Sequence, residues 1–444
     1  MPNSPDMPES YQPFNPAFVL FAIALFLSLL FYSIPLEGLR PSQKEAVQIY
    51  YADNISQAHE SIIDSFNAKY SGQIEVIPVN LPFDLFNTNE RKELIARVLR
   101  SRGSKMDVFA VDQVWVPRFT KWAEPLTRFF PNVALSNVLP DALKTCYTKQ
   151  QLVSVPLYID IGLLYYRRDI LEALPHFSQI ETDLLASMTW KEFIALRDRY
   201  FADEPFYIFP GDNYEGLICN FLETFGGDGD SIYKDENFEI NNSASRASIQ
   251  LMHDLINKYG ITPEAVISFD DNESYAYAFE HNIPFFRGWP SSLAEFHANP
   301  AYAEIARNLG IAALPHIDGH DPASVFGGWN LMISKFSKHK EEASLFLKYM
   351  LSEEAQDILY QLGGYPPILS DRYRDELYTQ KHPTLQYLGA LMKHGIHRPH
   401  HEDYTQISDI LSIQINEVLA QKTSITNALE TAVQELQSRG IPAR

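Results

Sequence analysis

The sequence predicts an α/β protein of two lobes that follows a single apolar segment near its N-terminus. Its 444 residues are more than one hydrophobic core usually holds, which indicates two compact lobes. From residue 47 onward, segments with strand-like and helix-like spacing alternate, as is typical of a mainly parallel sheet covered by helices. The alternation restarts after residue 160, so we expect the second lobe to begin there.

The first lobe opens with five alternating segments. Residues 47–51, 74–79 and 107–111 are expected to form strands. Between them, apolar side chains at helical spacing predict a helix over residues 56–70, and a second helix is expected over residues 90–102. This order predicts that the three strands run parallel.

The second half of the chain continues the alternation. A long predicted helix over residues 341–362 is stopped by Gly363 and Gly364. Further extended segments are expected at residues 163–166, 207–209, 283–286 and 311–314, and further helices at 190–201, 243–259, 407–420 and 424–436.

Residues 17–34 form an uncharged apolar run, and its length is at the threshold for a helix that spans a bilayer. No Lys or Arg precedes the run, and no small-x-small cleavage site follows it. We therefore expect an uncleaved anchor over residues 17–35 rather than a cleaved signal peptide. A tail over residues 1–16 precedes this anchor, and a polar linker over residues 36–46 follows it.

Charge and cysteine content exclude some classes of protein. The formal net charge of −20 argues against a general nucleic-acid binder, which would need a basic face. Cys146 and Cys219 belong to no CxxC pair, so no redox or metal motif is predicted from them. Two buried thiols are expected, and a disulfide between them stays open because the sequence does not show their separation.

The most informative motif is the apolar run 155–167, which holds Tyr158 and Asp160. Two residues apart on a strand, their side chains project from the same face. A buried carboxylate is costly unless a hydrogen bond compensates it. An aromatic ring beside a carboxylate suits a polyhydroxylated ligand, because the ring covers the C–H face of a sugar while the carboxylate accepts from its hydroxyls. The motif resembles the domain-crossing segment of bacterial extracellular solute-binding proteins, specifically the trehalose/maltose-type sugar receptors of ABC importers.

The resemblance implies a two-lobed periplasmic-binding-protein fold of type II, with ligand in the cleft between lobes that close on it. The chain would cross between the lobes three times, near residues 157–161, 290–293 and 328–331. The N-lobe would then hold residues 47–157 and 293–328, and the C-lobe residues 158–292 and 329–444.

The resemblance also implies a function. The protein would be a membrane-tethered, non-catalytic receptor that binds a maltose- or trehalose-like disaccharide, or an oligosaccharide, and delivers it to the permease subunits of an ABC transporter. Its binding domain would lie on the extracytoplasmic side of the inner membrane. The positive-inside rule alone favours the opposite orientation, because Arg40 and Lys44 follow the apolar run. No cofactor and no metal are implied.

Two further polar segments are candidates for the site. Asp112 follows a predicted parallel strand, and the carboxyl ends of such strands face the ligand crevice in open α/β sheets. The alternative role for Asp112 is a helix N-cap. Tyr214 and Glu215 begin a segment similar to the family's YEGLVC-type segment, whose polar end faces the cleft, and a capped helix start is the alternative.

Two tryptophans stand in motifs that resemble family segments. Trp289 lies in FFRGWP, which is similar to RNWP, and Gly327, Gly328 and Trp329 lie in FGGWN, which is similar to GGW. A lone tryptophan is more often a core residue than a ligand contact. Two of them at predicted lobe crossings favour stacking on a sugar.

The remaining candidates depend on the resemblance alone. Tyr365 stands where relatives place a tryptophan, and Arg398 begins an Arg-Pro pair whose arginine reaches the sugar in relatives. Arg91 matches another such arginine, although a solvated helix charge is the alternative.

Other functions stay open at this stage. A carbohydrate-active enzyme would use two of Asp112, Asp160 and Glu215 as acid and base, but the sequence does not bring any two to the required separation. A ligand-sensing ectodomain would need a separate signalling partner, because no kinase or cyclase is appended. The histidines at positions 394, 397, 400 and 401 match no closed metal site, so we expect them at the surface.

Overall fold

The computed structural model describes residues 46–444 apart from 84, 104, 202–203, 226–231 and 235–236, together with residues 17, 20, 21, 24 and 25. These described residues include no helix that is long and apolar enough to cross a membrane. The expected anchor over residues 17–35 falls largely outside them, as do the tail and the linker, so all three stay predictions.

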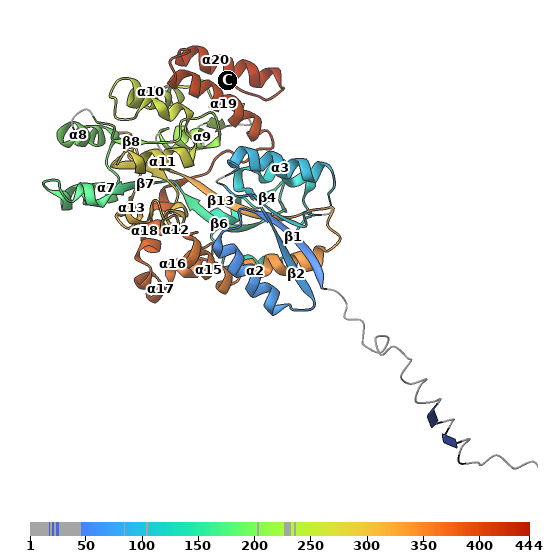
Figure 1. The fold of residues 1–444 in the computed structure, drawn as a ribbon. Coiled ribbons are helices and arrows are strands. Elements are labelled where there is room, and N and C mark those ends of the chain that lie inside the picture. The colour runs from blue at the N-terminus through green and yellow to red at the C-terminus, as the bar shows by residue number, and fades with distance from the viewer. Residues whose placement is uncertain are drawn as a thin grey trace, which may run out of the picture. The chain divides into compact units, whose positions relative to one another are not determined.

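The larger sheet has the strand order β14-β13-β3-β1-β2, and β6 also pairs with β13. Strand β1 runs parallel to β2 and β3, as the sequence predicts, whereas β13 runs antiparallel to β3 and β6. Helices α2 (Gln57–Lys69) and α3 (Thr88–Arg100) connect the parallel strands and pack against them (Figure 1). The strands span Val47–Asp53 (β1), Ile74–Asn80 (β2), Val108–Asp112 (β3), Val155–Ile161 (β6), Ser324–Ile333 (β13) and Gly395–Ile396 (β14).

The smaller sheet has the order β12-β7-β11-β8. Its strands span Leu163–Arg167 (β7), Tyr207–Ile208 (β8), Phe285–Gly288 (β11) and Leu309–Ala312 (β12). Near it, α19 packs against α20, α10 and α9, so the two last helices join an earlier part of the chain (Figure 1). These helices span Glu215–Glu223 (α9), Ser243–Asn257 (α10), Tyr404–Leu419 (α19) and Ile425–Ser438 (α20).

The predicted helix over residues 341–362 is two helices, α14 (Lys340–Met350) and α15 (Glu353–Gly363). Ser352 separates them, because its side chain accepts a hydrogen bond from the Ala355 N–H and caps α15. The other helices of six or more residues are α7 (Phe177–Ala186), α8 (Trp190–Tyr200), α11 (Asp271–Glu280), α12 (Ser292–Ala298), α17 (Glu376–Lys381) and α18 (Pro383–Leu391).

Strand pairing shows where the chain passes between the two sheets. The chain leaves the larger sheet after β6, enters β7 of the smaller sheet, and returns only between β12 and β13. Strand β13 pairs within the larger sheet through Ile333, so the pairing shows no passage at residues 328–331. Residues 47–444 form one compact unit, and the proposed lobe boundaries inside it stay predictions.

Strand β13 brings distant candidate residues together. It lies between β3 and β6, and in this register Trp329 is opposite both Asp112 and Tyr158. Gly327 is opposite Asp160. All residues of β3, β6 and β13 are buried, so this polar and aromatic group sits inside the fold rather than on its surface.

Candidate functional site

A cavity lies between residues of the larger sheet and the helices that begin near the smaller one. The space between its lining residues is about 880 Å³, and part of this space is open to solvent. Every predicted site residue except Arg91 lines it. The lining comprises Phe83, Asn87, Thr88, Asp112, Tyr158, Asp160, Tyr214, Glu215, Gly216, Cys219, Asp270, Asp271, Asn272, Tyr275, Trp289, Ser291, Ser292, Glu295, Gly327, Gly328, Trp329, Tyr365 and Arg398.

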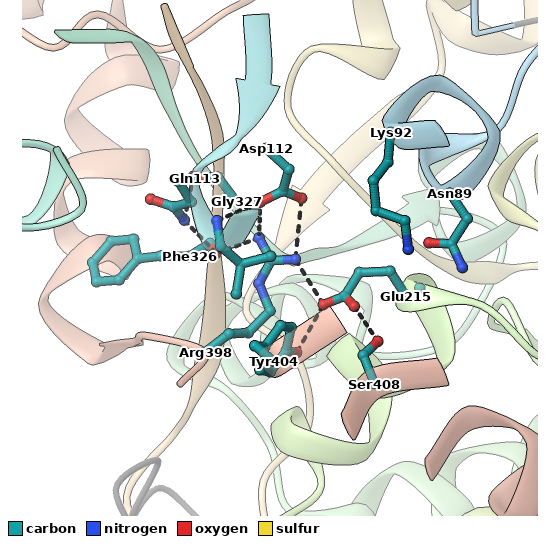
Figure 2. A network of polar contacts seen from close by, with 12 residues as sticks. Asn89, Lys92, Asp112, Gln113, Glu215, Phe326, Gly327, Arg398, Tyr404 and Ser408 are labelled. Carbon is teal, nitrogen blue, oxygen red and sulfur yellow. Dashed lines mark hydrogen bonds and ion pairs between the residues drawn. The ribbon is translucent and has the colours of Figure 1, made fainter. Parts of the chain in front are cut away.

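Arg398 is the centre of a buried ion-pair network (Figure 2). Its Nη2 donates to Oδ1 of Asp112 at 2.7 Å, and its Nη1 donates to Oδ2 of the same carboxylate at 3.1 Å. The same Nη1 also donates to Oε1 of Glu215 at 2.9 Å. One guanidinium thus joins strand β3 to helix α9, and charge-assisted bonds of this kind are strong and directional.

Glu215 receives two more hydrogen bonds inside this network. The Tyr404 hydroxyl donates to Oε1 at 2.8 Å, and the Ser408 hydroxyl donates to Oε2. Burial raises the pKa of Glu215 above its ordinary value, while the Arg398 guanidinium opposes that shift. The structure therefore pairs Asp112, Glu215 and Arg398 with one another, although the sequence suggested that each contacts a ligand separately.

Both polar segments stand at a helix start and line the cavity, but Tyr214, the residue before α9, makes no side-chain cap hydrogen bond. Asp112 caps the short turn Gln113–Trp115 by accepting from the Val114 N–H at 3.0 Å, and it also lines the cavity. Glu215 is the first residue of α9, where a carboxylate is favoured by the helix dipole, and it lines the same cavity.

Asp160 is a buried carboxylate with few partners. Its side chain is in the fully buried strand β6, and the residue is 4% exposed. Oδ1 accepts from the Ile161 N–H at 3.0 Å, and Oδ2 accepts from the Ser291 hydroxyl at 3.3 Å. Burial raises the pKa of Asp160 to about 7, against the opposing effect of these hydrogen bonds and of Arg287.

The ring of Trp289 packs against an arginine. The Arg287 guanidinium carbon lies 3.8 Å from the Trp289 ring centroid, and Arg287 donates to Glu223 at 2.8 and 3.2 Å. Gly327 also packs against this ring, since a Cβ there would approach the Trp289 ring to 2.6 Å. The sequence FGGW therefore makes room for the tryptophan of FRGWP.

Arg91 does not line the cavity, and the prediction that it contacts ligand there is not supported by its position. It is completely buried, and its Nη2 donates to Oδ1 of Asp53 at 2.8 Å. Its guanidinium carbon lies 4.0 Å from the ring centroid of Trp329 and 4.1 Å from that of Phe83. Arg91 thus supports Trp329, which does line the cavity.

Two tyrosines form a further part of the aromatic wall. The rings of Tyr158 and Tyr365 have centroids 4.5 Å apart, and both residues line the cavity. Tyr365 follows Gly364, which ends α15 in the left-handed conformation with φ of 67°. The two glycines that end the helix therefore also position Tyr365 in the wall of the cavity.

Sequence reasoning missed the start of α11. Asp270 caps this helix and forms a capping box with Glu273, and Asp271, Asn272 and Tyr275 of the same segment line the cavity. The sequence DDNE carries the capping-box pattern, which locates a helix start but not its position beside a cavity. The other missed residues are Phe83, Asn87, Thr88, Gly216, Cys219, Ser291, Ser292 and Glu295.

A second hollow continues from the cavity at its mouth. It shares Phe83, Asn87, Asp270, Asn272, Tyr275 and Glu295 with the first cavity. The Asn272 side chain donates to the Phe83 carbonyl oxygen at 3.0 Å, so a hydrogen bond joins the two sides of the mouth.

The histidine-rich segment makes contacts outside the cavity. Nε2 of His397 is 3.2 Å from Oδ1 of Asp141, and Nε2 of His400 is 2.9 Å from the Tyr147 carbonyl oxygen. Within the part of the chain that the structure describes, no group of three or more His, Cys, Asp or Glu side chains could hold a metal ion. Cys146 and Cys219 are buried free thiols, so they do not form the disulfide that the sequence left open.

Comparison with known proteins gives a family match over most of the chain. The model for bacterial extracellular solute-binding proteins matches residues 52–357. The chain is 26% identical over 407 residues to a probable ABC transporter-binding protein of Deinococcus radiodurans, with 88% of this chain and 93% of that protein covered. It is 21% identical over 379 residues to a probable amino-acid ABC transporter periplasmic-binding protein of Sinorhizobium fredii, with 82% of each covered. The solved structure of maltose-bound T. maritima MalE3 is similar with a TM-score of 0.77 and 26% identity, covering 88% of this chain and 99% of that chain.

Proposed function

Since the chain belongs to the family of bacterial extracellular solute-binding proteins, we propose that it is the sugar-binding component of an ABC importer. It would capture a maltose- or trehalose-like sugar outside the cytosol and present it to the permease subunits. Proteins of this family are transport components and not enzymes, so the interpretation as a carbohydrate-active enzyme is set aside.

The observation that carries the proposal is the combination of aromatic rings and carboxylates around one cavity. Trp289, Trp329 and Tyr158 offer ring surface, and Asp160 offers a buried acceptor with few protein partners. A sugar is amphipathic, with C–H faces that pack on rings and hydroxyls that donate to carboxylates. The similarity to a maltose-bound structure supports the same class of ligand.

The second hollow supports a ligand longer than a disaccharide. It continues from the cavity past Phe83 and Tyr275, and its lining combines aromatic rings with the carboxylates of Glu90 and Glu273. An oligosaccharide would extend one or more rings into this space.

One relative carries an amino-acid transporter name, but the charges of the cavity favour a sugar. An amino acid needs a cation or a set of free N–H donors for its α-carboxylate. Arg398 is the single Arg or Lys among the described lining residues, and both of its terminal nitrogens are already bonded to Asp112 and Glu215.

Calorimetric titration of the purified full-length chain with maltose, trehalose, maltotriose and a set of amino acids tests the proposal. We expect a carbohydrate to bind below millimolar concentration and the amino acids to give no signal. His400→Ala is the matched control, since His400 lies outside the cavity, and it should bind as the wild type does. Binding of an amino acid with no response to any carbohydrate would contradict the proposed function.

We also propose that residues 17–35 tether the protein to the membrane as an uncleaved helix. The proposal rests on the uncharged run without a cleavage site. N-terminal sequencing of the membrane-extracted protein should begin at or near Met1. A mature N-terminus between about residues 35 and 45 would show instead that the run is a signal peptide that is removed.

A further inference from the structure

The cavity lining holds many more acidic than basic side chains, and burial raises the pKa of three of the acidic ones, Asp160, Glu215 and Asp271. Its described lining contains one cationic side chain, that of Arg398. It contains six carboxylates, those of Asp112, Asp160, Glu215, Asp270, Asp271 and Glu295.

Protein cations compensate only part of this charge. Arg398 bonds to Asp112 and Glu215, and these two carboxylates exceed its single positive charge. Asp160 forms no ion pair with any residue that the structure describes, and its two hydrogen bonds come from neutral donors.

Asp271 is also compensated weakly. Its Oδ2 accepts from the Tyr214 hydroxyl at 2.7 Å, while its Oδ1 is 3.9 Å from Nη1 of Arg287. That arginine already forms a close ion pair with the buried Glu223 at 2.8 Å. Oδ1 of Asp271 accepts no hydrogen bond from the described residues within the usual distance and angle limits, although the Trp289 side chain lies close enough to lower the pKa of Asp271.

The aromatic wall adds to the same preference. The faces of Tyr158, Tyr365, Trp289 and Trp329 carry negative electrostatic potential, which attracts cations and repels anions. The two tryptophans already attract arginines, since Arg287 and Arg91 each lie about 4 Å from one of their ring centroids. Both the charged and the aromatic side chains therefore disfavour an anionic ligand.

We propose that the cavity selects its ligand by charge: it binds a sugar with an ammonium substituent more tightly than the matched neutral sugar and rejects sugars that carry a carboxylate or a phosphate. This inference rests on the proposed function, because it assumes a carbohydrate ligand. An ammonium group has three N–H donors and forms charge-assisted bonds to carboxylates such as Asp160 and Asp271. An anionic sugar would lose its hydration and meet no free cation in return.

The test compares maltose with analogues that differ only in charge. Maltose, analogues with an amino group in place of the hydroxyl at C6 of either ring, and analogues with a carboxylate at the same carbons are titrated into the full-length protein. We expect at least one amino analogue to bind about tenfold more tightly than maltose, which corresponds to about 1.4 kcal/mol. Both carboxylate analogues should bind at least tenfold more weakly than maltose.

Variants of cavity residues then test whether the tighter binding of the amino analogue depends on the cavity. Asp160→Asn or Asp271→Asn should reduce the advantage of the amino analogue to threefold or less. Asp318→Asn removes an equal charge at an exposed position outside the cavity and should leave the advantage unchanged. Thermal melting of each variant checks the fold, and either cavity variant that folds suffices for the comparison.

The outcomes separate the two proposals. If maltose binds while no amino analogue binds more tightly, or while a carboxylate analogue binds equally well, the charge selection is wrong and the proposed function stands. If no carbohydrate binds, with maltose, trehalose, maltotriose and the charged analogues all included, both proposals fall. An advantage of the amino analogue that persists in both cavity variants also overturns the assignment to this cavity.

Discussion

Asp160 shows how one residue links the sequence motif to chemistry. A carboxylate in the middle of a buried strand is costly, and the Ile161 N–H, the Ser291 hydroxyl and the nearby Arg287 compensate it in part. Its strand partner Gly327 has no side chain, and the Trp289 ring packs where a Cβ of Gly327 would lie. A ligand that donates hydrogen bonds to Asp160 would stabilise the ionised carboxylate and so gain affinity from a group whose burial otherwise destabilises the fold.

The first prediction follows from the raised pKa of Asp160, which is about 7. Sugar hydroxyls donate to the ionised carboxylate, so binding opposes its protonation. We expect affinity for maltose to fall by up to about tenfold per pH unit as the pH drops from 7 to 5. Titration calorimetry between pH 5 and 8 measures this slope, and Asp160→Asn should flatten it. Equal slopes in the two proteins would assign the pH dependence to another group.

The raised pKa of Asp160 also makes folding stability depend on pH, in the direction opposite to that of sugar affinity when no ligand is present. The pKa of Asp160 exceeds the value of about 3.9 for an unfolded chain, so the folded state binds the extra proton between about pH 4 and 7. The contribution of Asp160 to the free energy of unfolding therefore decreases as the pH rises through this window. Denaturant titrations of the unliganded wild type and of Asp160→Asn should diverge in that direction.

The second prediction concerns Trp329, which is 6% exposed and lines the cavity beside Arg91. Trp329→Ala removes ring surface at the centre of the site, and central tryptophans of interfaces contribute about 2 kcal/mol or more. We expect affinity for the bound sugar to fall by at least about thirtyfold, from the same magnitude. Trp122→Ala is the control, since Trp122 lies outside the cavity and should leave the affinity unchanged. Wild-type affinity in Trp329→Ala would remove this residue from the site.

At the scale of elements, periodicity predicted the alternation of strands and helices, and the three parallel strands of the larger sheet are confirmed. Local pattern did not show the break at Ser352, because the apolar spacing continues across it while a capping side chain starts a new helix. The FGGWN motif of strand β13 was recognised in the sequence, but the pairing of this strand with β3 and β6 was not predicted. Strand partners are set by long-range packing, which local spacing does not encode.

The site was predictable in composition but not in contacts. The motifs located Asp112, Glu215 and Arg398, yet the bond from Arg398 to Asp112 joins residues 286 positions apart. In the same way, Arg91 was recognised as a candidate, but its ion pair with Asp53 depends on how α3 packs against β1. Sequence spacing shows which residue types are present, and only the fold decides which charges compensate one another.

The third prediction tests the backbone of β13. Gly328 has φ of 125°, and a Cβ there would lie 2.5 Å from the Tyr158 carbonyl oxygen, so an alanine is both strained and blocked. We expect Gly328→Ala to lower the free energy of unfolding by about 3 kcal/mol, at the upper end of the usual cost of backbone strain. Denaturant unfolding measures this change. Gly319→Ala is the matched control, because Gly319 also has positive φ but nothing lies within 4 Å of its added Cβ, and it should cost about 1 kcal/mol.

At the scale of the whole compact unit, polar contacts join the elements on the two sides of the cavity. Arg398 connects β3 with α9, and Asn272 at the start of α11 bonds to the loop that holds Phe83. A third contact joins α3 to α19, where Nζ of Lys92 lies 3.5 Å from Oδ1 of Asp409 (Figure 2 shows Lys92). If the cavity opens by separation of these elements, the three contacts would break together.

The last prediction tests this closure at Asp409. Lys92 is 3% exposed and burial lowers its pKa, while Asp409 opposes this shift most, ahead of Glu215 and Glu93. Asp409→Asn would remove the ion-pair partner of this buried ammonium; because the Asp409 side chain is 47% exposed, the lost stabilisation is modest, and separation of α3 from α19 should become somewhat easier. We expect small-angle scattering of the unliganded variant to give a larger radius of gyration than the unliganded wild type. Saturating ligand should return the variant to the wild-type profile, with a weaker affinity that reflects the cost of closing.

Glu417→Gln removes a charge of the same sign from the same helix and should change neither quantity. Identical scattering and identical affinity in Asp409→Asn and the wild type would show that this contact does not hold the cavity closed.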